Sequence, residues 1–317
     1  MKAVLPYDAS PGVRRLIAGL DPSIVRAVVL AEADSESLRR ELADAEVLLH
    51  VLAPVTDRVM EAAPRLKLVQ KIGVGVDAID RDFARSHGIA VCNMPGTNTV
   101  AVAELTLALM FATLRRVAAL DADLRAGAGW PPAAAHLDAA GELDGATVGL
   151  VGYGAVSRRL RPALSALGAD VVVHARTPPD DGTRAVALDE LIASSDVVSL
   201  HLPATEATRG LIDARRIARM KPGAILINTA RGALVDESAL RAALAEGKLS
   251  GAGLDVFARE PIASGDPLLA LPNVVVTPHV AWMTTGTWRR SLEVVVENCR
   301  RLRAGAPLLH RVDGGTS

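Results

Sequence analysis

The sequence has 317 residues, half of them hydrophobic, and its 36 acidic and 35 basic residues leave a net charge of −1. This length predicts about two domains, and the near-neutral charge without a basic block argues against nucleic acid and anionic membranes as partners. Because no apolar run approaches the roughly 20 residues that span a bilayer and the N-terminus lacks a signal-peptide stretch, we expect a cytoplasmic protein.

The first 96 residues alternate short apolar runs with stretches that favour helix. Alternating strands and helices predict a parallel sheet covered by helices. Cys92 and Cys299 are the two cysteines. They lack metal-ligand spacing, so we expect buried free thiols and no metal site. Strands are expected at 25–30, 47–52, 67–73 and 89–93, and helices at 35–43 and 57–63.

An apolar-rich stretch follows the turn at Gly96-Thr97-Asn98. Residues 99–120 predict one long helix, with Glu104 as its single acidic residue. A helix that is apolar nearly all round is typical of burial between domains or subunits. Residues 121–145 contain glycines and prolines that break regularity, so we expect an arm or a loop-rich excursion there.

Residues 146–280 cycle repeatedly through strand and helix. Six strands with helices between them match a doubly wound nucleotide-binding sheet. A final helix is expected at 284–303. The six strands are expected at 147–151, 170–175, 196–202, 224–229, 251–256 and 273–277, and the helices at 154–167, 188–195, 212–220 and 236–246.

The first of these strands runs into Gly152-Tyr153-Gly154 and then into a helix. Gly152 permits a sharp turn, Gly154 lets the backbone approach a pyrophosphate, and the helix N-terminus offers N–H groups to that anion. Ser157 replaces the third glycine of the fingerprint and is small enough for close packing. A G-x-G turn alone is a weak signal, and a plain structural turn is the alternative.

The end of the second strand indicates which dinucleotide binds. A carboxylate there would bind the ribose hydroxyl, but the position is Ala175, followed by Arg176 and Thr177. A guanidinium can pair with a 2′-phosphate, and Thr177 can add a hydroxyl. This favours NADPH over NADH, although Arg176 stacking on adenine is the alternative.

Arg231, Glu260 and His279 follow three successive strands near their carboxyl ends. In an open α/β sheet, ligands bind at that edge. His279 is suited to donate a proton to a carbonyl, and a carboxylate bonded to it would orient the ring. Arg231 could bind a substrate carboxylate and polarise its keto oxygen. Each residue alone is more often structural or a solvated charge, but three on one edge predict an active site.

The ordered motifs resemble those of the D-isomer-specific 2-hydroxyacid dehydrogenases over nearly the whole chain, and most resemble the NADP-dependent glyoxylate and hydroxypyruvate reductases. The resemblance implies two Rossmann-like α/β domains with doubly wound parallel sheets and the active site in the cleft between them. Residues 1–96 with 283–317 would form the substrate domain, and residues 97–282 the dinucleotide-binding domain. The motifs are Gly73–Asp77, Val102–Glu104, Gly152–Gly154, His201–Pro203, Asn228–Gly232, Ala252–Val256, Glu260-Pro261 and Thr277–His279.

Matching positions imply a role for each residue. Arg231 would bind substrate, Glu260 would support the histidine, and His279 would be the acid and base. The backbone at Val74 and Gly75 would bind the substrate carboxylate, and the helix after Asn98 would form a homodimer. The cofactor would be lined by Gly152, Gly154, Ala155, Val156, Arg176, Thr177, Pro203, Thr208, Thr229 and Asp255, with Asp255 near the nicotinamide amide.

One departure and two rival functions stay open. Trp282 stands where the family often has a small residue, so its ring either narrows the pocket or packs at the domain hinge. The expected reaction is reduction of small 2-keto acids, such as glyoxylate or hydroxypyruvate, to D-2-hydroxy acids. The rivals are oxidation of formate or phosphite, and a dinucleotide-sensing protein without catalysis.

Overall fold

The computed structural model describes residues 1–312 and contains two compact units. Unit 1 comprises Met1–Asn98 and the chain from Trp282 onward, and unit 2 comprises Thr99–Ala281. The expected domain boundaries, after residues 96 and 282, differ from these by one or two residues. Each unit contains one parallel sheet with helices on both faces, so the predicted α/β fold class is confirmed.

Unit 1 is built on a five-stranded sheet in the order β2-β1-β3-β4-β5. This is one of the common doubly wound orders. Strand β1 was not predicted, because its run Lys2–Pro6 is short and ends in proline, and α1 and α4 were not predicted either. The strands are β1 (Lys2–Pro6), β2 (Arg26–Leu30), β3 (Val47–His50), β4 (Leu68–Lys71) and β5 (Ala90–Cys92), and the helices are α1 (Pro11–Ala18), α2 (Ser35–Leu42), α3 (Asp57–Glu61), α4 (Arg81–Ser86) and α12 (Thr285–Ala304).

Strands β1, β3, β4 and β5 of unit 1 are mostly buried on both faces, as parallel strands under helices require, whereas the edge strand β2 is only partly buried. Leu49 on β3 packs in the cluster formed with α1 and α12, whereas its neighbour Leu48 packs in the cluster formed with α2, α3 and α4. Cys92 and Cys299 are both buried in the first cluster. Successive side chains on a strand point to opposite faces, so each strand contributes to both cores.

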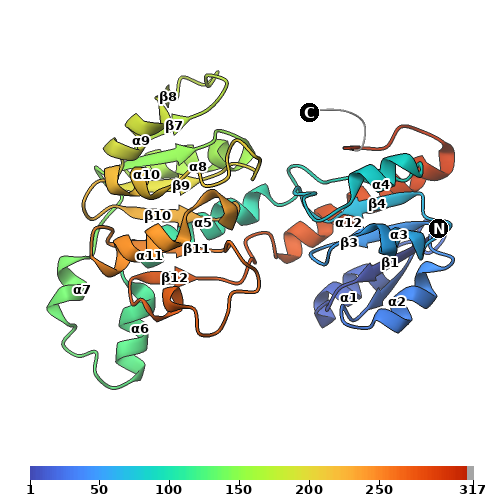
Figure 1. Ribbon diagram of the computed structural model, residues 1–317, viewed down its shortest axis with the longest axis horizontal. Coiled ribbons are helices and arrows are strands. Elements are labelled where there is room, and N and C mark those ends of the chain that lie inside the picture. The colour runs from blue at the N-terminus through green and yellow to red at the C-terminus, as the bar shows by residue number, and fades with distance from the viewer. Residues whose placement is uncertain (313–317) are drawn as a thin grey trace. The chain divides into compact units, whose positions relative to one another are not determined.

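Unit 2 is built on a seven-stranded sheet in the order β12-β11-β10-β9-β6-β7-β8 (Figure 1). This order reverses between β6 and β9, which is where such folds bind dinucleotides. The two-residue β8 at the sheet edge was not expected. The strands are β6 (Thr147–Val151), β7 (Asp170–His174), β8 (Arg184–Ala185), β9 (Val197–Leu200), β10 (Ile225–Asn228), β11 (Gly251–Leu254) and β12 (Val274–Val276).

The helices of unit 2 cover opposite faces of this sheet. Val148 and Leu150 of β6 pack with α5 and α8, and Val151 packs with α9, α10 and α11. Pro162 lies inside α8, which continues through it. The helices are α5 (Thr99–Leu114), α6 (Val117–Arg125), α7 (Ala134–Asp138), α8 (Ala155–Ala166), α9 (Leu188–Ser194), α10 (Ala214–Arg219) and α11 (Glu237–Ala245), with 3₁₀ turns at Gly232–Leu234 and Pro267–Ala270.

The predicted single helix over 99–120 is wrong. The chain instead forms α5 and α6, separated at Arg115 and Arg116, and Arg116 adopts a left-handed backbone conformation with φ 56°. No glycine or proline marks this break in the sequence. Arg116 is only 8% exposed, in the space beside the side-chain-free Gly251, so tertiary packing holds a conformation that local propensity disfavours.

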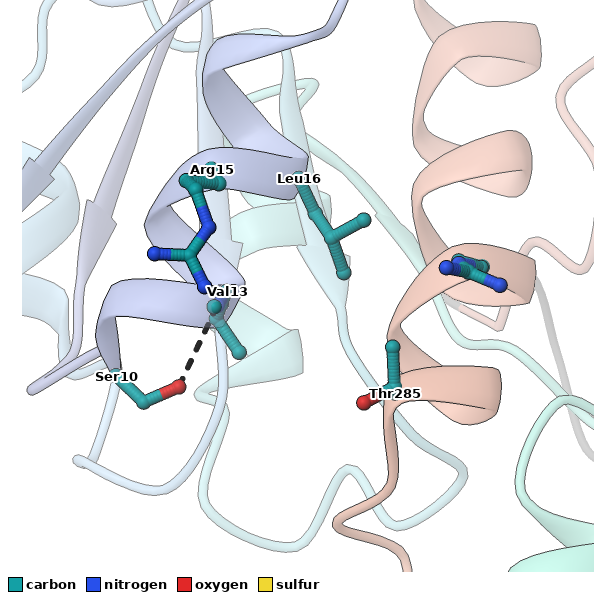
Figure 2. Close-up of a pocket in the computed structure, with 7 residues that line it drawn as sticks. Ser10, Val13, Arg15, Leu16 and Thr285 are labelled. Carbon is teal, nitrogen blue, oxygen red and sulfur yellow. Dashed lines mark hydrogen bonds between the residues drawn. The ribbon is translucent and has the colours of Figure 1, made fainter.

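The described residues contain no helix that is long and apolar enough to cross a membrane. One cavity, of about 360 Å³, opens between the first turns of α1 and α12 in unit 1 (Figure 2). Leu16 points into the space between these helices. None of the residues that line this cavity is a predicted site residue.

Candidate active site

The G-x-G turn joins β6 to α8 as the motif predicts. Gly152 has φ 97°, and a side chain there would overlap the carbonyl of His201. A Cβ on Gly154 would meet nothing within 4 Å, so its backbone faces open space. The first turn of α8, which starts at Ala155 and Val156, contains no acidic residue. These features suit an anion held by backbone N–H groups.

Ser157 has a role that the motif did not predict. Its side chain is fully buried, and its hydroxyl donates a 2.6 Å hydrogen bond to the carbonyl oxygen of Gly152. A glycine at this position could not make that bond. The serine therefore fixes the turn directly, in addition to fitting the narrow space between helix and strand.

The loop after β7 carries Arg176 and Thr177, and both residues are exposed. Two carboxylates, which the sequence motifs did not indicate as functional, lie further along this loop. Arg158 donates to Asp180 at 2.7 Å, and the Tyr153 hydroxyl donates to Asp181 at 2.5 Å. Both acids are thus occupied by donors from the G-x-G turn and α8.

The Asp181 carboxylate stays ionised in this arrangement. Hydrogen bonds from Thr183 and then from Tyr153 lower the pKa of Asp181 to about 2. The Arg158 guanidinium also lies over the Tyr153 ring, 4.8 Å from its centroid. These contacts tie the loop that carries Arg176 to the G-x-G turn.

Three further predicted cofactor residues lie in unit 2. The Thr208 hydroxyl donates to the carbonyl oxygen of Pro203 at 2.7 Å, which brings these two residues together after β9. Thr229 is 8% exposed, and its hydroxyl lies 2.9 Å from that of Thr106 on α5. Their contact with a cofactor stays a prediction.

His279 and Glu260 form a close pair. The distance from His279 Nδ1 to Glu260 Oε2 is 2.6 Å, and the side chains are 26% and 35% exposed. An ionised carboxylate only accepts hydrogen bonds, so Nδ1 carries the proton and Nε2 is the nitrogen left to serve a reactant. The residues come from the segments after β12 and β11, which are neighbours in the sheet.

Glu260 is held in its ionised form. Partial burial by itself would raise the pKa of Glu260. Hydrogen bonds from His279 and from the Phe257 N–H, with the positive charges of His279 and Arg231, outweigh this and lower it. The Phe257 N–H donates to the other oxygen, Oε1, at 3.0 Å. Both carboxylate oxygens therefore have a donor.

Asp255 organises the backbone around the histidine. Its side chain is fully buried and accepts hydrogen bonds from the Thr277 hydroxyl at 2.5 Å and from the N–H groups of Val280 and Ala281 at 2.9 Å. His279 has φ 54°, an uncommon conformation for a non-glycine residue, and its N–H donates to the Asp255 carbonyl at 2.8 Å. Burial raises the pKa of Asp255, and these donors oppose it. Contact between Asp255 and the nicotinamide amide stays a prediction.

Arg231 follows β10, which lies beside β11 in the sheet. It is partly buried, and its Nη1 donates to the Ala230 carbonyl at 2.7 Å. The next residue, Gly232, lies so close to the loop after β11 that a Cβ there would overlap the Phe257 carbonyl. The structure thus brings Arg231, Glu260 and His279 to the carboxyl ends of three neighbouring strands. Gly232 belongs to the motif Asn228–Gly232, but no role was predicted for it.

The remaining predicted residues belong to unit 1. Val74 is 44% exposed after β4, and Gly75 follows it. Trp282 is 7% exposed and packs in the core of unit 1, with its ring centroid 5.6 Å from that of Trp288. A role for the Trp282 ring in narrowing the substrate pocket stays a prediction.

The chain matches known proteins over most of its length. Residues 107–281 match the family model described as the NAD-binding domain of D-isomer-specific 2-hydroxyacid dehydrogenases. A glyoxylate reductase from Korarchaeum cryptofilum is 39% identical over 269 residues, which cover 83% of this chain and 81% of that protein. The chain belongs to the D-isomer-specific 2-hydroxyacid dehydrogenase family.

Other family members differ in name and length. An (S)-sulfolactate dehydrogenase from Chromohalobacter salexigens is 43% identical over 75% of this chain and 78% of its own. A D-3-phosphoglycerate dehydrogenase from Mycobacterium leprae is 40% identical over 89% of this chain but 54% of its own. This chain therefore spans about half the length of the phosphoglycerate dehydrogenases that it matches.

Solved structures agree with the family fold. The TT0316 protein from Thermus thermophilus superposes with a TM-score of 0.87 at 39% identity, over 98% of this chain and 100% of that one. An NADPH-dependent glyoxylate/hydroxypyruvate reductase from Sinorhizobium meliloti, in complex with NADP and malonate, has a TM-score of 0.81 at 30% identity, over 98% and 96% of the two chains.

Proposed function

We propose that this protein is an oxidoreductase that reduces small 2-keto acids, such as glyoxylate or hydroxypyruvate, to D-2-hydroxy acids with NADPH. The observation that carries the proposal is the 2.6 Å pair of His279 and Glu260, which together with Arg231 lies in the segments after three neighbouring strands of the dinucleotide-binding unit. The intact His279–Glu260 pair, with the positive charge of Arg231 lowering the pKa of Glu260, favours catalysis over binding alone.

A nicotinamide dinucleotide fits the residues of unit 2. The backbone at Gly154 faces open space, and the turn and the acid-free first turn of α8 provide donors for a pyrophosphate. We propose that Ala155, Val156, Pro203, Thr208, Thr229 and Asp255 line the rest of the site. When bound, the cofactor supplies the hydride.

The side chains of this chain then supply the other parts of the reaction. We propose that Arg231 binds the substrate carboxylate, together with the backbone N–H groups of Val74 and Gly75, and stabilises negative charge that develops on the keto oxygen. His279 donates its Nε2 proton to that oxygen, so the product is the neutral hydroxyl. Glu260 keeps the ring in the required tautomer and stabilises its protonated form.

Arg176 is the residue that we expect to select NADPH. Arg176→Gln removes a guanidinium that a 2′-phosphate can pair with, so we expect the KM for NADPH to rise at least about tenfold. The KM for NADH should change little, because NADH lacks that phosphate. Steady-state kinetics of wild type and variant with both cofactors measures this. A wild-type enzyme that clearly prefers NADH would end the NADPH assignment.

A substrate screen tests the proposed reaction against its rivals. Oxidation of NADPH with glyoxylate and hydroxypyruvate, and reduction of NADP⁺ or NAD⁺ with formate and phosphite, are followed by the absorbance of the reduced nicotinamide. We expect turnover with the keto acids. Turnover with formate or phosphite alone would replace the proposal by that dehydrogenase activity. Cofactor binding without turnover on any of these substrates would favour a sensor.

We also propose a cytoplasmic homodimer formed through α5. The face of α5 away from the sheet exposes Glu104, Ala108 and Phe111. Large apolar side chains remain exposed on the segment that follows, which supports a protein surface that a second copy covers. They are Val117, Leu124, Trp130 and Leu137, each more than half exposed.

A further inference from the structure

Glu237 makes a contact that its place at the start of α11 does not require. Asp236 already caps this helix, because its carboxylate accepts a 3.0 Å hydrogen bond from the Ala239 N–H. The Glu237 carboxylate instead reaches a loop 21 residues further along and accepts the N–H of Ala258 at 2.5 Å. The bond joins α11 to the segment between β11 and Glu260.

That segment carries the partner of the candidate catalytic histidine. Phe257 and Ala258 have consecutive N–H groups that go to two different carboxylates, Glu260 and Glu237 respectively. The first bond closes a short turn around Glu260, and the second anchors that turn to α11. On its other side the turn lies against the backbone of Gly232. Glu237 and Gly232 thus both contact the turn that carries Glu260.

The surroundings of Glu237 disfavour its ionised form, so placing the charged carboxylate there costs free energy. Burial raises the pKa of Glu237, and the negative charges of Asp266 and Glu260 raise it further. The Ala258 N–H and the positive charge of Arg241 act in the opposite direction. A glutamate placed at this site for helix stability alone would sit better in water, where the helix N-terminus still favours it.

We propose that Glu237 is a positioning residue for the reaction. It holds the Phe257–Glu260 turn so that Glu260 orients the His279 ring and stabilises its protonated form. The inference rests on the proposed function for its kinetic consequence, whereas its structural part concerns the His279–Glu260 hydrogen bond alone. The proposed role requires no contact of Glu237 with His279 or with a reactant. It acts through the backbone at Ala258 and through its own negative charge near Glu260.

Two substitutions at Glu237 separate these two effects. Glu237→Gln keeps a carbonyl oxygen that can accept the Ala258 N–H but removes the charge, and Glu237→Ala removes both. Asp236→Ala is the matched control, because it weakens the start of the same helix without touching the loop. Thermal unfolding and NADPH binding are measured for all three, so that loss of folding or of cofactor binding is recognised.

The kinetic expectations differ between the variants. In Glu237→Ala we expect kcat to fall about tenfold with the KM for NADPH within about twofold, because a loosened turn misplaces the proton donor. In Glu237→Gln we expect kcat within about threefold of wild type.

A measurement without turnover keeps the inference testable by itself. The short His279–Glu260 bond should give a downfield Nδ1 proton signal that His279→Ala abolishes. We expect this signal in wild type, Glu237→Gln and Asp236→Ala, and its loss or broadening in Glu237→Ala. An unchanged signal and an unchanged kcat in Glu237→Ala, or equal losses in Asp236→Ala, would overturn the positioning role. Absence of keto-acid turnover in wild type would instead contradict the proposed function.

Discussion

His279→Ala should lower kcat for keto-acid reduction by roughly 10²–10⁴-fold, the range typical of a lost general acid. The imidazole pairs with a carboxylate at 2.6 Å through one nitrogen and keeps the second nitrogen for a reactant. The KM for NADPH should change little, because no predicted contact to the dinucleotide involves this ring. Steady-state kinetics at several pH values measures both parameters.

A second variant separates the loss of the proton donor from a change in the backbone conformation at residue 279. His279 has φ 54°, a conformation that alanine adopts less readily than asparagine, so His279→Asn is compared with His279→Ala. Both should lose the pH dependence as well as the rate. If either variant retains activity within a few-fold of wild type, His279 is not the proton donor.

Gly232→Ala should lower kcat/KM about a hundredfold, as expected for a displacement of catalytic groups by about 1 Å. A Cβ at this position overlaps the carbonyl of Phe257, which is backbone and cannot rotate away. The turn that carries Glu260 must therefore move, or Arg231 must move with residue 232. Overpacking of this kind also destabilises a fold by about 1–3 kcal/mol, which thermal or denaturant unfolding detects.

Gly265→Ala is the matched control for this substitution. It lies in the same unit and the same loop-rich region after β11, but a Cβ there meets nothing within 4 Å and the backbone is not left-handed. Its kinetics and stability should stay close to wild type. Wild-type kinetics in Gly232→Ala would show that the turn does not depend on this close contact.

Much of the fold could be predicted from the local sequence, because strands and helices in an α/β protein have distinct hydrophobic periodicities and short connections. The runs at 147–151 and 170–174 are rich in β-branched and apolar residues, which parallel strands buried on both faces require. The sequence did not predict local structure correctly where tertiary packing overrode the local conformational preference. No glycine or proline near Arg116 predicts a helix break. The break exists because the surrounding packing stabilises the left-handed backbone conformation of Arg116.

The sequence by itself determined the family, the parallel α/β architecture and the identity of Arg231, Glu260 and His279 as the candidate catalytic set, because those depend on residue types in a fixed order along the chain. The tertiary structure alone decided how these groups are held. Asp255 supports the backbone of His279, Ser157 ties the G-x-G turn, and Glu237 anchors the turn before Glu260. Ser157 and Glu237 each act through one hydrogen bond, of 2.6 Å and 2.5 Å respectively. The partner in each bond is a backbone group whose position cannot be read from the amino-acid sequence. Sequence patterns record which residues are present and how they are spaced, whereas such bonds depend on distances between atoms that only folding brings together.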